Sequence, residues 1–76
     1  MMSSLQILGE VVRAERERRG LSQEALADLG GVSRSHIGEI ERGEVNLSFA
    51  ALSDIAVGLG VKLSDLIEEY EQKSER

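Results

Sequence analysis

The sequence predicts an all-α domain of five helices. Apolar residues fall on one face of each proposed helix, at the spacings of three and four that are typical of an amphipathic helix. Proline is absent, and with one Phe and one Tyr the core must be built from Leu, Ile, Val and Ala, the composition of a small helical bundle. Serines and glycines stand where the helices would begin and end, and no segment reads as a strand.

Length and cysteine content limit the class of protein. A chain of 76 residues is expected to form a single domain over 1–76. At this size folding buries only roughly 60% of the surface of the unfolded chain, so a partner subunit would add stability. Cysteine is absent, which excludes disulfides and thiolate metal sites and fits a reducing cytoplasm. No apolar run approaches the ~20 residues that span a bilayer, and no secretion signal is legible, so we expect a cytoplasmic protein without membrane contact.

The first, fourth and fifth helices are expected to support the others. The first runs from about Leu8 to Arg19. The fourth starts near Ser48 and the fifth runs from about Leu63 to Gln72, so that the segment at about 48–72 supplies core and dimer contacts. The polar tail from Gln72 to Arg76 is expected to fray.

The second and third helices are expected to form a helix-turn-helix at about 22–43. Ser22 caps the second helix, because its hydroxyl can accept from the free backbone N–H groups of the first turn. Gly30 and Gly31 break this helix, since at least one of them must take a positive φ that other residues resist. Ser33 caps the third helix. The unit predicts sequence-specific binding of double-stranded DNA rather than catalysis.

The third helix divides into two faces. Ile37 and Ile40 point inward, on the side of Glu41. The outward face is the candidate reading surface, and it carries Arg34, Ser35, Gly38, Glu39 and Arg42. Gly38 costs about 1 kcal/mol relative to Ala in a helix. Either its missing side chain lets the backbone approach another surface closely, or it is a tolerated weak spot.

The net charge of −5 argues against DNA binding, because affinity for phosphates comes from Lys and Arg. The charge is unevenly distributed. Residues 1–43 carry 6 basic and 7 acidic side chains, whereas residues 44–76 carry 3 basic and 7 acidic ones. The acidity therefore lies mainly outside the helix-turn-helix, which weakens the objection.

From Leu8 to about Ile67 the chain resembles the Xre/Cro-type family of bacterial and phage repressors, through the runs LGEVVRAERERRGLSQEALA, GVSRSHIGEIERG and LSFAALSDIAVGLGV. Within that family, RSHIGEIERG followed by VNLS is similar to the controller proteins of restriction-modification systems. Short repressors of other operons share most of these residues. The resemblance implies a five-helix, phage-repressor-like helix-turn-helix fold and a homodimeric regulator of its own operon and of the endonuclease gene.

The resemblance also implies roles for single residues in DNA binding. Arg34 and Ser35 match positions that reach base edges, and a bidentate Arg–guanine pair supplies roughly 1–3 kcal/mol of discrimination. Glu39 matches another reading position, where a carboxylate could accept from cytosine N4 but would be repelled by phosphates. Gln23 matches a phosphate contact at a helix N-terminus. Further backbone or groove contacts are expected from Ser33, Gly38, Arg42 and Asn46.

Arg16 and Glu41 correspond in the resemblance to a salt bridge that ties the first helix to the third. A buried carboxylate needs a cation, so we expect these two residues to orient the helices rather than to contact DNA.

The chain departs from the family pattern at two places. Glu15 replaces an aliphatic residue, which predicts a less deeply seated first helix, and Glu44 with Val45 stands where relatives place a basic residue that grips DNA.

The fifth helix is expected to form the dimer interface through an apolar stripe of Leu63, Leu66, Ile67 and Tyr70. The alternative is ordinary core packing of the same residues. Dimerisation would serve function, because two recognition helices about 34 Å apart read an inverted repeat along one face of the duplex.

Catalysis and metal binding lack support in the sequence. His36 is the single histidine, and without a Cys or a second His it makes no zinc site; we expect it to be packed or to face a phosphate. The serines are explained as caps or polar contacts, and no Gly-rich phosphate loop or paired carboxylates appear. We expect no enzyme activity, no cofactor and no metal.

Three functions remain open from the sequence. The first is an autoregulatory transcriptional regulator, with RNA polymerase as a candidate further partner. The second is the DNA-binding antitoxin of a toxin-antitoxin pair, which a neighbouring toxin gene would favour. The third is a protein-interaction module without DNA binding, which the acidic balance and Glu44 would suit. Steep salt dependence of DNA affinity separates the first two from the third.

Overall fold

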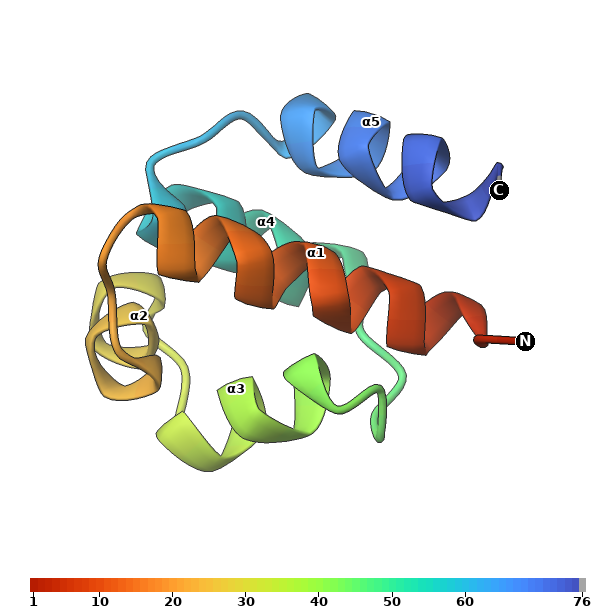
Figure 1. The fold of residues 1–76 in the computed structure, drawn as a ribbon. Helices are drawn as coiled ribbons and strands as arrows, with labels where there is room; N and C mark the ends of the chain where they lie inside the picture. The colour runs from red at the N-terminus through yellow and green to blue at the C-terminus, as the bar shows by residue number, and fades with distance from the viewer. Residues whose placement is uncertain (76) are drawn as a thin grey trace.

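The computed structural model describes residues 1–75, which form five helices (Figure 1). They are α1 (Ser4–Arg18), α2 (Gln23–Gly30), α3 (Arg34–Glu41), α4 (Phe49–Leu59) and α5 (Leu63–Ser74). In Figure 1, α3 packs against one side of α1 and α5 against the other, while α4 lies behind and contacts both α2 and α5. The expected all-α, five-helix class is confirmed. No helix within the described residues is long and apolar enough to cross a membrane.

Four of the helices begin at a serine that caps them. Each hydroxyl accepts a hydrogen bond from the backbone N–H three residues later, at 3.0–3.2 Å, and the capping residues are Ser3, Ser22, Ser33 and Ser48. This bond satisfies one of the N–H groups that the first turn leaves without a partner inside the helix. The caps predicted at Ser22 and Ser33 are therefore confirmed, and so is the start of the fourth helix near Ser48.

The start of α1 was predicted too late. The helix begins at Ser4 rather than near Leu8, because the backbone N–H of Ser3 donates to the Gln6 side chain at 2.9 Å and completes a capping box. At the other end of the chain α5 continues to Ser74, beyond the predicted end at Gln72. Residue 76, the end of the tail that was expected to fray, lies outside the described residues.

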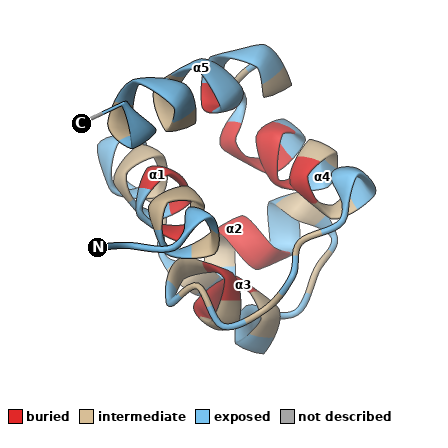
Figure 2. Ribbon diagram, turned by 90° about the vertical axis from the view of Figure 1, so that its right-hand side faces the viewer, coloured by how far each residue is buried: buried red, intermediate tan, exposed pale blue. Residues whose placement is uncertain are grey.

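One apolar core joins all five helices. Figure 2 shows buried segments facing the space that the helices enclose. The core consists of Val11, Val12, Leu26, Ala27, Ile37, Ile40, Leu52, Ile55, Ala56, Leu59 and Leu66. Three further apolar residues, Leu8, Leu63 and Tyr70, are partly buried and pack against this core. Burial of this set fixes α3 relative to α1 and α2.

The helices α1 and α3 cross closely at Gly9. A Cβ atom at this position would lie 2.6 Å from the carbonyl oxygen of Glu41, and closer still to that of Ile40. These are backbone atoms of α3, so neither can move aside without shifting the helix. Gly9 thus allows the two helix backbones to approach, and it sets the distance between them.

Glu15 does not lift α1 away from the core, contrary to the expectation from the sequence. Val11 and Val12 are fully buried one turn earlier. The Glu15 carboxylate accepts from Arg18 at 2.6 Å and from Arg19 at 3.1 Å, and the hydrogen bond from Arg18 contributes most to lowering its pKa from the ordinary value. Arg18 also donates to Glu69 at 2.9 Å, which ties α1 to α5.

Candidate nucleic-acid interface

Residues 31–33 form the turn between α2 and α3. Gly31 ends α2 in the left-handed conformation at φ 70°, which glycine adopts without steric cost. The N–H of Val32 then donates to the carbonyl of Ala27 at 3.0 Å, and Ser33 caps α3 through the N–H of His36 at 3.1 Å. The prediction that the glycine pair breaks the helix is correct, with Gly31 as the residue of positive φ and Gly30 still inside α2.

The helix α3 presents one buried and one exposed face. Ile37 and Ile40 lie in the core, whereas Arg34 and Ser35 at its first turn are exposed. Within residues 1–75 the Arg34 guanidinium forms neither an ion pair nor a side-chain hydrogen bond. An unpaired cation at the exposed start of a capped helix is free to meet an external acceptor.

His36 and Glu39 continue the exposed face by one turn. The His36 Nδ1 atom lies 3.8 Å from Glu39 Oε1, and both side chains are partly exposed. The proximity of His36 and Glu39 was not predicted, although their spacing of three residues on one helix is a signal for it.

Gly38 is not bare, contrary to expectation. The residue is buried, because the Arg42 side chain folds back over it, and a Cβ at Gly38 would lie 3.0 Å from Arg42 Nη1. Arg42 in turn forms an ion pair with Glu44, with Nε 3.0 Å from Oε2. At this position the exposed face of α3 therefore presents the Arg42 guanidinium, paired with Glu44, and this pairing was not predicted from the sequence.

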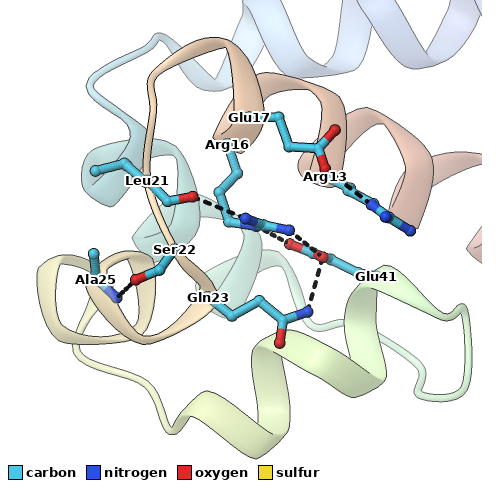
Figure 3. Close-up of polar contacts among 8 residues, drawn as sticks. All are labelled: Arg13, Arg16, Glu17, Leu21, Ser22, Gln23, Ala25 and Glu41. Atoms are coloured by element: carbon cyan, nitrogen blue, oxygen red, sulfur yellow. Dashed lines mark hydrogen bonds and ion pairs between the residues drawn. The ribbon is translucent and has the colours of Figure 1, made fainter.

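Arg16 and Glu41 form the ion pair that the resemblance implied (Figure 3). Arg16 Nε donates to Glu41 Oε2 at 2.6 Å and Nη2 to Oε1 at 3.0 Å, and the side chains are only 11% and 4% exposed. Arg16 also donates to the carbonyl of Leu21 at 2.8 Å. The hydrogen bond from Arg16 to Glu41 is the main cause of a raised Arg16 pKa. The pair joins the end of α1 to the end of α3.

Gln23 belongs to the same network. Its side-chain Nε2 donates to Glu41 Oε1 at 3.0 Å, so that α1, the start of α2 and the end of α3 meet at one carboxylate (Figure 3). Gln23 was predicted to contact a DNA phosphate, whereas its hydrogen bond to Glu41 inside the protein was not predicted. One amide hydrogen remains for an external acceptor.

Asn46 is exposed in the segment that follows α3. Its neighbours Val45 and Leu47 are partly buried against the core and hold this segment in place. Among the residues predicted to bind DNA, Arg34, Ser35 and Glu39 lie on α3. Ser33 and Arg42 cap its two ends.

The residues of the predicted dimer stripe on α5 differ in how far the single chain buries them. Leu66 is only 1% exposed and belongs to the core of the chain itself, because α5 packs on both α1 and α4. Leu63 and Tyr70 also pack against that core, which leaves Ile67 as the exposed large apolar residue of the four.

More apolar surface is exposed on α4 than on α5. Phe49 is 76% and Val57 is 73% exposed, compared with 39% for Ile67. The eight-residue spacing of Phe49 and Val57 places them roughly 80° apart around the helix axis. The exposure of Phe49 and Val57 was not predicted from the sequence.

A short α2, a glycine turn and a capped α3 with an exposed first turn define a helix-turn-helix DNA-binding domain. A family profile described as helix-turn-helix matches residues 12–66. The chain therefore belongs to this helix-turn-helix family, the Xre type that its sequence resembles, and is a DNA-binding transcriptional regulator rather than an enzyme.

Particular relatives include control proteins. The chain is 36% identical over 75 residues to control protein C.SmaI of Serratia marcescens, covering 99% of this chain and 89% of the relative. Its structure is similar to the restriction-modification controller protein C.AhdI from Aeromonas hydrophila, with a TM-score of 0.80, 39% identity, and 82% and 94% of the two chains covered. The controller protein C.Esp1396I gives a TM-score of 0.92 at 28% identity, with 100% of both chains covered.

Proposed function

We propose that this chain is the controller of a restriction-modification operon, which binds as a homodimer to an inverted repeat upstream of its own gene. The observation that carries the proposal is the exposed, unpaired Arg34 beside Ser35 at the capped start of α3. The similarity to C.SmaI along nearly the whole chain supports the operon context. Contact with RNA polymerase stays a prediction.

The contacts to DNA sort into reading and positioning. Arg34 reads guanine through O6 and N7, Ser35 adds a second base contact, and Glu39 accepts from cytosine N4. Contacts to the sugar-phosphate backbone then fix the register of α3 in the major groove. These come from Gln23, Ser33, Arg42 and Asn46.

Arg34→Ala is expected to relax sequence choice. The ratio of affinities for a duplex from the chain's own upstream region and a random duplex should fall about tenfold or more, because one bidentate base contact is lost. Competition mobility-shift titrations at fixed salt measure this ratio. Asn46→Ala is the matched control, since loss of a backbone contact should weaken both duplexes alike.

Two outcomes would contradict these assignments. If Arg34→Ala weakens both duplexes equally, Arg34 positions the protein and does not read. If the wild-type chain binds no duplex even at low salt, the regulator proposal fails and a protein-interaction module becomes the better description.

The dimer is proposed to form through the apolar side chains that the monomer leaves exposed, on α4 and α5. Phe49→Asp and Ile67→Asp should each leave the fold intact, because neither side chain is buried. The variant that touches the interface should sediment as a monomer and bind the inverted repeat at least about tenfold more weakly, since one recognition helix then acts alone. Analytical ultracentrifugation shows which of the two helices forms the interface. If both variants keep the wild-type mass, neither α4 nor α5 forms it through these side chains.

A further inference from the structure

Arg42 lies at the end of the exposed face of α3 and is already paired with a carboxylate. Its guanidinium covers Gly38, four residues earlier and one turn back along the helix, with Nη1 3.0 Å and Cζ 3.8 Å from where a Cβ would stand. A side chain at position 38 would compete for that space. Because position 38 carries no side chain, the Arg42 guanidinium can lie over the middle of the exposed face.

Glu44 holds this cation. Arg42 Nε lies 3.0 Å from Glu44 Oε2 in an ion pair, and both side chains are more than half exposed. Gly43 turns the chain back at φ +73°, and the Glu44 N–H donates to the carbonyl of Glu39 at 2.9 Å, so the backbone that carries the carboxylate is fixed. The hydrogen bond between the two side chains raises the pKa of Arg42 and lowers that of Glu44. Both groups are therefore charged when the protein meets DNA.

The ion pair opposes DNA binding in two ways. A phosphate that takes Arg42 must first displace Glu44, and the displaced carboxylate then faces a polyanion. Exposed pairs of this kind are weak, so a phosphate with its own negative charge can compete successfully. Glu39, one turn earlier on the same face, adds a further negative charge near Arg42.

We propose that Glu44 is an internal competitor of the DNA backbone for Arg42, which lowers the affinity of the protein for all DNA alike. Arg42 exchanges Glu44 for a phosphate when the complex forms. The inference rests on the proposed function, because it assumes that the exposed face of α3 enters the groove. It assigns to Glu44 a positioning role and no contact with bases.

Glu44→Gln is the direct test, because the amide keeps the size of the side chain and removes its charge. Relative to wild type, affinity for both the upstream and the random duplex should rise about tenfold at 50 mM salt, because Arg42 then neutralises a phosphate without leaving a carboxylate unpaired. This steepens the salt slope by about 0.9 per chain, or about 1.8 for the dimer, so the gain should fall about twelvefold by 200 mM and nearly vanish. Arg42→Ala should weaken binding less in the wild-type background than in the Glu44→Gln background, because in wild type the phosphate contact only replaces the ion pair that it breaks. Arg42→Ala combined with Glu44→Gln should abolish most of the gain.

Glu68→Gln is the matched control. It removes the same charge from an exposed position on α5, on the far side of α1 from α3 (Figure 1). If Glu44→Gln and Glu68→Gln give equal affinities and salt slopes, only net charge matters and the proposal is overturned, although wild-type binding would still support the proposed function. If the wild-type chain binds no duplex, both fail. Unchanged melting temperatures of the two variants exclude a folding artefact.

Discussion

Glu41→Ala is expected to remove about 3 kcal/mol of folding stability or more, because deleting one member of a buried ion pair leaves the other charge uncompensated. Arg16 would retain only the carbonyl of Leu21 as acceptor, in a site where its side chain is 11% exposed. Gln23 would lose its partner as well. For a domain of this size, the melting temperature should fall by about 12–24 °C.

Thermal and urea unfolding followed by circular dichroism measure this effect. Arg13→Ala is the matched control, because it breaks the Arg13–Glu17 pair, whose side chains are 63% and 58% exposed, and should cost no more than about 0.5 kcal/mol. The combined replacement of Arg16 by Met and Glu41 by Leu should recover most of the stability, since neither charge then remains buried. If Glu41→Ala has the same melting temperature as wild type, the ion pair makes no net contribution to folding stability.

Local chemistry explains which parts of the fold could be predicted from the sequence. A serine ahead of an apolar run caps a helix through atoms within three residues, so Ser22, Ser33 and Ser48 could be identified without the rest of the chain. The cap at Ser3 depends on the same chemistry, but the prediction started from Leu8, the first residue of the apolar pattern, and overlooked Gln6.

Contacts between helices could not be predicted in the same way. The pattern of α5 shows that Leu66 and Ile67 lie near an apolar face, but only the placement of α1 and α4 decides that Leu66 is covered and Ile67 is not. In the same way, Gly38 has an exposed position on the helix, and only the conformation of Arg42 covers it. Sequence spacing fixes the face of a helix, and the neighbouring elements decide what covers that face.

Gly9→Ala is expected to destabilise the protein by about 2–3 kcal/mol, even though alanine is the better helix former. The new methyl group would meet the carbonyl oxygens of Ile40 and Glu41, which belong to the backbone of α3. The helices α1 and α3 would have to separate, and that movement stretches the ion pair from Arg16 to Glu41 and loosens the packing of Ile37.

Gly38→Ala is the matched comparison, because it makes the same substitution inside α3 itself. There the nearest atom is the end of the flexible Arg42 side chain, which can swing away, so we expect a neutral change or a gain of up to about 1 kcal/mol from helix propensity. Both variants change helix propensity equally, and the difference between their unfolding free energies therefore reports the crossing alone. Equal stabilities would show that α1 and α3 can move apart at no cost, in which case the α1–α3 crossing would not be what holds the recognition helix in place.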